Sequence, residues 1–205
     1  VIVEQLEKLK KNNITNILAL RGDKTPNMIM SGDFSHASDL ASFIRSYDSS
    51  FNICGACYPE GHCESENVDN DIENLHYKIE SGMTHLITQL FFDNSSFYTF
   101  RDKVAAAGIN IPIQAGIMPI TSKSQIERTV SMCGASLPNR FATMINRYSD
   151  DPEALRDAGI SYATNQIIDL IANGVDGIHL YTMNNVCVAS KISENIESII
   201  KSANK

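Results

Sequence analysis

Short apolar runs alternate with amphipathic stretches along the whole chain, and this alternation constrains the fold most. Apolar runs bounded by turn residues occupy 16–20, 53–58, 85–90, 111–117 and 177–181. Helical periodicity covers 1–12, 36–47, 69–81, 95–107, 122–132, 152–173 and 184–203. Strands that alternate with helices form parallel sheets, and near-continuous apolar runs suit strands covered on both faces. The sequence therefore predicts an α/β fold made of repeated helix–strand units.

Glycine follows three of the predicted helices, at Gly82, Gly108 and Gly174. Glycine readily adopts the left-handed conformation that ends a helix, so each of these residues should close a helix just before a strand. The longest connection, between the fourth and fifth strands, holds one further predicted short helix at 138–148. We interpret it as an insertion within one unit, so that residues 1–205 form a single domain.

Composition narrows the range of partners. The formal net charge is −7, which argues against a general affinity for nucleic acid, because phosphate contacts need clustered lysine and arginine. The chain has no apolar run long enough to cross a membrane, so a small-molecule partner is expected. Five cysteines without a signal peptide fit a reducing compartment, and we predict a cytoplasmic location.

Two of the cysteines, Cys54 and Cys57, have the spacing of a metal or redox pair. They lie inside a predicted strand, where residues three apart face opposite sides, whereas redox pairs lie at helix N-termini and zinc pairs on tight turns. We therefore favour buried structural thiols and predict no metal site.

Polar residues directly follow four of the five predicted strands, at the sheet edge where parallel α/β folds bind ligands. The five segments are Leu-Arg-Gly-Asp ending at Asp23, Tyr-Pro-Glu-Gly-His ending at His62, Ile-Thr-Gln-Leu-Phe-Phe-Asp ending at Asp93, Gly-Ile-Met-Pro-Ile ending at Ile120, and His-Leu-Tyr-Thr-Met-Asn ending at Asn184. In this order and at these intervals they resemble the methylenetetrahydrofolate reductase family, and the resemblance covers essentially the whole chain.

The resemblance implies a (β/α)8 TIM barrel, of which about the last five βα units are present. Such a barrel needs about 250 residues, and this chain has 205. The family implies FAD as cofactor and the reduction of 5,10-methylenetetrahydrofolate to 5-methyltetrahydrofolate by NAD(P)H, a step of one-carbon metabolism that supplies methionine. It also implies a homo-oligomer.

Roles in the family transfer to individual positions of this chain. The resemblance assigns cofactor binding to Arg21, Gly22, Asp23, His36, Ala37, Tyr58, His62, Asp71, Asn74 and Lys78. It assigns substrate binding to Asp23, Gln89, Gln125 and Tyr181, with Asp23 and Gln89 as catalytic residues. Asp71, Asn74 and Lys78 also share one helix face, because they are spaced i, i+3 and i+7.

Asp23 is the residue we single out for chemistry, because a carboxylate near the folate favours the iminium cation that forms when the methylene bridge opens. The family's proton donor is a glutamate on the first strand, in a Phe-Glu-Phe-type segment. We expect the N-terminal strands of the barrel to be missing from this chain, and the chain alone to be inactive. One alternative is therefore a catalytically incomplete flavin- or folate-binding fragment, or an accessory subunit that needs a partner chain. Another is a different α/β-barrel enzyme; the lack of a strand-end lysine counts against an aldolase.

Three positions depart from the family pattern. Tyr77 stands where relatives commonly have arginine, Thr129 where an aromatic residue often packs the nicotinamide, and Asn185 where an arginine often follows the last strand. These departures bear on the electron donor and on the grip on the folate tail more than on the type of reaction.

Overall fold

One parallel sheet organises the protein. The structure, a computed structural model, describes residues 1–22, 33–133 and 135–205. The strands follow one another in space in the order of the chain: β1 (Asn16–Leu18), β2 (Asn52–Cys57), β3 (Met83–Thr88), β4 (Ile113–Ile117) and β5 (Gly177–Leu180). A doubly wound sheet reverses its strand order at a switch point, whereas an α/β barrel adds each strand beside the previous one. The predicted fold, consecutive units of a TIM barrel, is confirmed.

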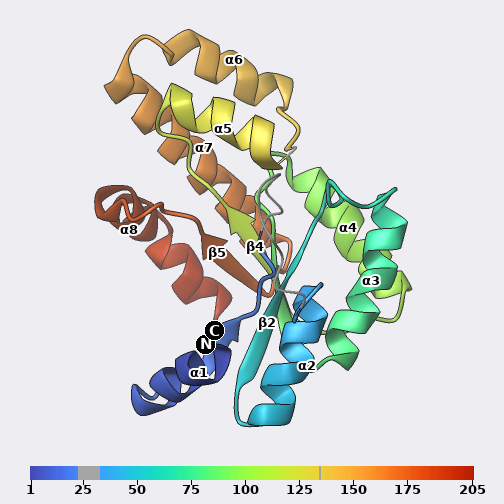
Figure 1. Ribbon diagram of the computed structural model, residues 1–205. Helices are drawn as coiled ribbons and strands as arrows, with labels where there is room; N and C mark the ends of the chain where they lie inside the picture. Colours follow the sequence, from blue (N-terminus) through green and yellow to red (C-terminus); the bar gives the residue numbers. More distant parts are fainter. Residues whose placement is uncertain (23–32, 134) are drawn as a thin grey trace.

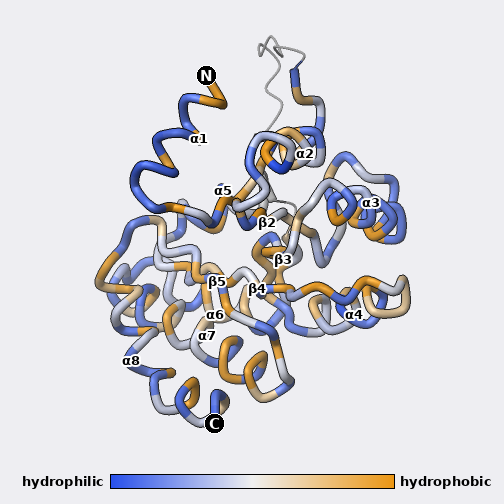
Figure 2. The backbone as a smooth tube through the Cα atoms, turned by 90° about the horizontal axis from the view of Figure 1, so that it is seen from below, coloured by the Kyte–Doolittle hydropathy of each residue, from blue (hydrophilic) through white to orange (hydrophobic). Residues whose placement is uncertain are grey.

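Helices cover the outer side of this sheet. Viewed from below, β2 to β5 follow an arc with α3, α4 and α7 on its convex side (Figure 2). None of the described helices is both long and apolar enough to span a membrane. The helices are α1 (Ile2–Lys11), α2 (Ala37–Tyr47), α3 (Val68–Glu80), α4 (Asn94–Ala106), α5 (Lys123–Cys133), α6 (Asn139–Tyr148), α7 (Pro152–Ala172) and α8 (Val186–Ala203) (Figure 1).

The predicted elements all form, with small shifts at their ends. Gly82, Gly108 and Gly174 have φ values of 99°, 79° and 71°, which confirms the predicted helix endings. Because Gly82 turns the chain at once, β3 begins at Met83 and ends at Thr88, two residues before the predicted 85–90. The short helix predicted in the longest connection is α6, which packs against α7.

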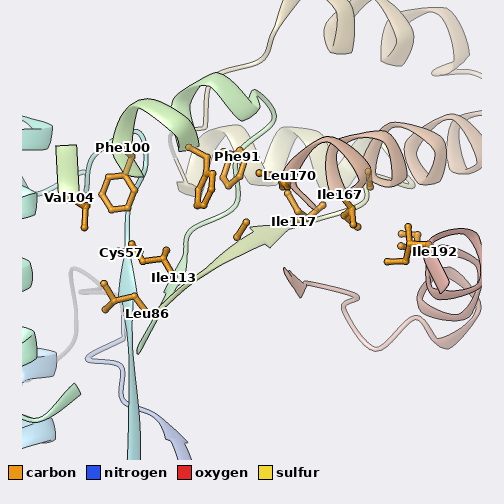
Figure 3. Packing of buried hydrophobic residues seen from close by; sticks show 14 of the residues in the cluster. Cys57, Leu86, Phe91, Phe100, Val104, Ile113, Ile117, Ile167, Leu170 and Ile192 are labelled. Atoms are coloured by element: carbon orange, nitrogen blue, oxygen red, sulfur yellow. The ribbon is translucent and has the colours of Figure 1, made fainter. Parts of the chain in front are cut away.

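The main core lies between the sheet and helices α3, α4, α7 and α8 (Figure 3). Strand residues alternate, so that Leu86, Ile113 and Ile117 face these helices, with exposed fractions of 0%, 4% and 0%. Cys57 belongs to the same core, whereas Cys54, three residues earlier, does not. Both thiols are buried inside β2, as predicted, and burial raises the pKa of Cys54 to about 11.

The opposite face of the sheet, on the inside of the arc, is more polar. Paired residues of parallel strands point to the same side, and the register aligns Cys54 with His85, Ile87 with Gln114, and Gly116 with His179. The histidines and Gln114 are only half-buried. Partial burial lowers the pKa of both imidazoles, His85 and His179, because it disfavours the charged form.

Candidate functional site

Four of the predicted cofactor residues lie together between the end of β2 and one face of α3. His62 meets the ring of Tyr58 edge-on, with 4.5 Å between ring centroids. Asp71 accepts hydrogen bonds from the backbone N–H of His62 at 2.5 Å and from the hydroxyl of Ser65 at 2.7 Å. The ammonium of Lys78 lies 5.6 Å from the Tyr58 ring centroid. The first turn of α3 therefore anchors the loop that follows β2, and one face of α3 completes the cluster.

Lys78 is the partly buried cation of this cluster. Its Nζ donates to the carbonyl oxygen of Ala56 at 2.6 Å, and burial lowers its pKa. An ammonium has three N–H donors, and Ala56 takes one of them. A cation with further donors beside the ring of Tyr58 can bind a phosphate-bearing ligand that also carries a ring. Asn74, on the same face of α3, is exposed.

The end of β1 is tied to the same loop. The guanidinium of Arg21 donates to both carboxylate oxygens of Glu64, at 3.0 and 2.9 Å. Such paired bonds fix orientation as well as distance. Gly22 follows with a φ of 82°, a conformation that favours glycine. Asp23, the residue predicted to carry the chemistry, lies outside the described residues.

His36 and Ala37 form the start of α2. The carboxylate of Asp39 accepts hydrogen bonds from the backbone N–H groups of Ser35 and His36, at 2.9 and 2.8 Å, and so caps the helix. The side chain of His36 is 73% exposed. Among the described residues, no hydrogen bond or ion pair joins His36 or Ala37 to the cluster around Tyr58.

A second group of predicted residues lies across β3, β4 and β5. The backbone N–H of Gln89 donates to the carbonyl oxygen of Cys57 at 2.8 Å, which places Gln89 beside Tyr58. The hydroxyl of Tyr181 donates to the carbonyl oxygen of Thr88 at 3.0 Å, which places Tyr181 beside Gln89. Tyr58, Gln89 and Tyr181 therefore form a row across the carboxyl ends of the strands.

Both predicted glutamines present amide N–H donors. The side-chain oxygen of Gln89 accepts from the backbone N–H of Leu90 at 2.9 Å. That of Gln125, on α5, accepts from the backbone N–H and the hydroxyl of Thr121, at 2.8 and 3.0 Å. Each of these backbone N–H groups needs an acceptor, so the side-chain carbonyl of each glutamine is engaged by it. The NH2 group of each glutamine therefore points away from these partners. Within the described part of the chain, no hydrogen bond joins Gln125 to Gln89 or Tyr181.

The three departures from the family pattern have distinct structural settings. Tyr77 is 64% exposed on α3, whereas Thr129 is buried in α5 with 4% exposure. The side-chain oxygen of Asn185 accepts from the backbone N–H of Val188 at 3.2 Å and thereby caps α8. Asparagine is among the preferred residues for that position, so Asn185 has a local structural role here.

Sequence reasoning missed three residues that organise the site: Glu60, Thr88 and Gly116. Glu60 accepts hydrogen bonds from the backbone N–H and hydroxyl of Ser136, which joins the loop after β2 to the segment between α5 and α6. Thr88 accepts the hydroxyl bond of Tyr181, and Gly116 leaves room for the Tyr181 ring. Only Gly116 carries a usable signal, because a glycine inside a strand often marks a close approach of another chain segment.

The chain is similar to known folate enzymes along most of its length. Residues 1–197 match the family model described as methylenetetrahydrofolate reductase. The chain is 37% identical over 183 residues to methylenetetrahydrofolate reductase 1 of Schizosaccharomyces pombe, covering 87% of this chain and 30% of that protein. It is 36% identical over 185 residues to 5,10-methylenetetrahydrofolate reductase of Pectobacterium carotovorum subsp. carotovorum, covering 88% of this chain and 61% of that protein. The chain thus spans less than two thirds of both relatives.

Among solved structures, one neighbour is an uncharacterized protein from Clostridium thermocellum, described as binding two copies of 5-methyl-5,6,7,8-tetrahydrofolic acid. The TM-score is 0.60 with 15% sequence identity, and the match covers 94% of this chain and 78% of that one. At this identity the likeness concerns the fold, and it agrees with the barrel order of the strands.

Proposed function

This chain belongs to the methylenetetrahydrofolate reductase family, and we propose that it forms part of an enzyme that reduces 5,10-methylenetetrahydrofolate to 5-methyltetrahydrofolate with NAD(P)H, using FAD. The observation that carries the proposal is the row of Tyr58, Gln89 and Tyr181, which the backbone bond from Gln89 to Cys57 and the hydroxyl bond from Tyr181 to Thr88 align across the carboxyl ends of the strands. Ligands bind at this edge in α/β barrels.

The described residues fit a flavin dinucleotide at one end of this row. Lys78 and its remaining N–H donors suit the diphosphate, and the rings of Tyr58 and His62 offer apolar surface beside it. Asp71 and the Arg21–Glu64 pair hold the surrounding loop in place. Bound FAD would supply the transfer of hydride from the nicotinamide to the folate.

Gln89 serves both substrates in this proposal. Its committed carbonyl leaves an NH2 donor, which can bind the carboxamide oxygen of a nicotinamide or an acceptor on a pterin ring. Gln125 presents a donor in the same way, from α5. The two substrates would therefore occupy one site in turn.

Asp23 has a different task, electrostatic stabilisation of the cation formed when the methylene bridge opens. A carboxylate acts on positive charge that develops only on the folate, so Asp23→Asn should slow folate reduction more than reduction of the flavin by NAD(P)H. Stopped-flow absorbance of the flavin in the full-length protein separates the two half-reactions.

The matched control is Asp33→Asn, which removes an exposed carboxylate ten residues further along the chain. It should leave both rates unchanged. Gln89→Ala should weaken both half-reactions. Equal slowing of the two half-reactions by Asp23→Asn would refute the assignment of Asp23, and an inability of the unsubstituted protein to take up FAD would refute the proposed function.

A homo-oligomer, a cytoplasmic location and a single domain over residues 1–205 stay predictions. Light scattering of the purified full-length protein measures the assembly directly.

A further inference from the structure

Tyr181 reaches across a strand to make its hydrogen bond. It lies directly after β5, and its backbone N–H donates to Ile117 of the neighbouring strand β4 at 2.9 Å. Its hydroxyl donates to the carbonyl oxygen of Thr88, at the end of β3, at 3.0 Å. Because β4 lies between β3 and β5, the ring passes over β4 at Gly116.

Gly116 provides the space for this crossing. A Cβ atom at this position would lie 2.3 Å from the carbonyl oxygen of Thr88 and 2.7 Å from Cε2 of Tyr181. Both distances are far below normal contact, and one of the two partners is backbone that cannot turn away. Glycine is thus required here by packing. Its backbone N–H also donates to the hydroxyl oxygen of the fully buried Thr88 at 2.8 Å.

The bonded carbonyl belongs to the peptide between Thr88 and Gln89. We propose that Gly116 is a positioning residue for the folate site: its missing side chain lets Tyr181 bind this peptide, and the bond holds Tyr181 and Gln89 at a fixed separation. This inference rests on the proposed function and deepens it. Since the hydroxyl proton of Tyr181 is donated to Thr88, the ring face of Tyr181 is the part that contacts the folate.

A second strand glycine offers a matched control. A Cβ at Gly55, on β2, would lie 2.2 Å from the sulfur of Met83 and 3.3 Å from a methyl group of Leu86. Gly55 is therefore also crowded, but against side chains on the helix-facing side of the sheet. Gly55→Ala should lower stability, as Gly116→Ala does, without moving Tyr181.

The experiment compares Gly116→Ala, Gly55→Ala and Tyr181→Phe in the full-length protein with its flavin. Gly116→Ala should raise the KM for methylenetetrahydrofolate about tenfold or more, the scale expected for a misplaced binding group. Gly55→Ala should lower Tm by a similar amount but change this KM less than about twofold, because its clash lies on the helix-facing side of the sheet, away from Tyr181. In Gly116→Ala, flavin reduction by NAD(P)H should respond less than the folate step.

Non-additivity gives a sharper criterion. Tyr181→Phe removes only the hydroxyl, and in the Gly116→Ala background it should add little, because the alanine has already broken the same bond. The proposal is wrong if the effects of Gly116→Ala and Tyr181→Phe on the KM multiply in the double variant. It is also wrong if Gly116→Ala and Gly55→Ala raise the KM equally.

A spectroscopic readout is independent of the proposed function. The ring of Tyr181, which meets the imidazole of His179 edge-on at 4.6 Å, is followed directly through its own resonances. In protein labelled at tyrosine, Gly116→Ala should shift the Tyr181 ring signal, assigned with Tyr181→Phe, and Gly55→Ala should not. An unmoved signal would refute the role of Gly116 even in an active enzyme, whereas an inactive protein with a shifted signal would refute only the proposed function.

Discussion

Lys78 combines a stability cost with a binding role in a single side chain. It is partly buried and its pKa is lowered by desolvation, so the folded protein bears a desolvation penalty that a bound anion would offset. Lys78→Met keeps the length of the side chain and removes the charge. In flavin-free protein it should change the free energy of unfolding by less than about 1 kcal/mol, while it raises the Kd for FAD about tenfold or more.

Urea unfolding and flavin titration measure the two quantities. Lys8→Met, on the exposed surface of α1, is the control and should change neither. A large loss of stability with unchanged FAD affinity would show that Lys78 is structural and not a ligand of the cofactor.

His85 and His179 on the inner face of the sheet predict a dependence of stability on pH. Partial burial lowers the pKa of both imidazoles, so the unfolded chain binds more protons than the folded one below about pH 6.5. The free energy of unfolding should therefore fall as the pH drops from about 7.5 to 5.5, the range around the unperturbed histidine pKa. His85→Gln/His179→Gln should reduce this fall, measured by urea unfolding.

The exposed His76 on α3 provides the comparison. His76→Gln is the control for the substitution itself, and the double variant should reduce the fall in stability further than this control does. If the double variant shows the same pH dependence of stability as the unsubstituted protein, the two inner-face histidines do not contribute to that dependence.

Single residues of the site could be predicted from the sequence where their role depends on position in a strand. Tyr58, Gln89 and Tyr181 follow strands directly, so the rule that ligands bind at carboxyl ends finds them. Gly116 and Thr88 escaped prediction, because their role depends on a ring arriving from β5, 65 or more residues away. The strand glycine indicates that some segment approaches closely, but local patterns do not say which one.

At the scale of elements, α6 is the insertion that distinguishes the longest connection. Its apolar side packs through Phe141, which stacks on Phe92 with 4.4 Å between ring centroids and lies 4.5 Å from Tyr162. Phe141 is 1% exposed. Phe141→Ala should lower the free energy of unfolding by about 3 to 5 kcal/mol, as lost burial and a residual cavity add.

Tyr148, at the other end of α6 and 40% exposed, is the matched aromatic control. Tyr148→Ala should cost less than about 1 kcal/mol, as exposed substitutions usually do. Denaturant unfolding compares the two variants, and similar losses would mean that α6 is not held by this contact.

Helices and strands were found in the right order because periodicity and glycine positions act locally. The ends of the strands were less predictable: β3 begins two residues early, because Gly82 turns the chain directly into it. The register that aligns Gly116 with His179 depends on pairing between distant segments, which no local pattern specifies.

For the whole molecule, the order of the strands matters most. Because the strands are parallel and pair in chain order, the described residues that follow them lie at one edge of the sheet, and the cofactor group at β1, β2 and α3 adjoins the substrate group at β3 to β5. The backbone bond between Gln89 and Cys57 joins the two groups. A site of this kind can hold a cofactor and a substrate side by side, as the proposed reaction requires.

The most direct test of the proposed function is the anaerobic turnover of the full-length protein with NAD(P)H and 5,10-methylenetetrahydrofolate. Flavin absorbance and mass spectrometry of the folate follow the reaction. A methylenetetrahydrofolate reductase should form one 5-methyltetrahydrofolate for each NAD(P)H oxidised, while the flavin is bleached by NAD(P)H and recovers when the folate is added. A protein that carries no flavin, or one that oxidises NAD(P)H and leaves the folate unchanged, would contradict the proposed function.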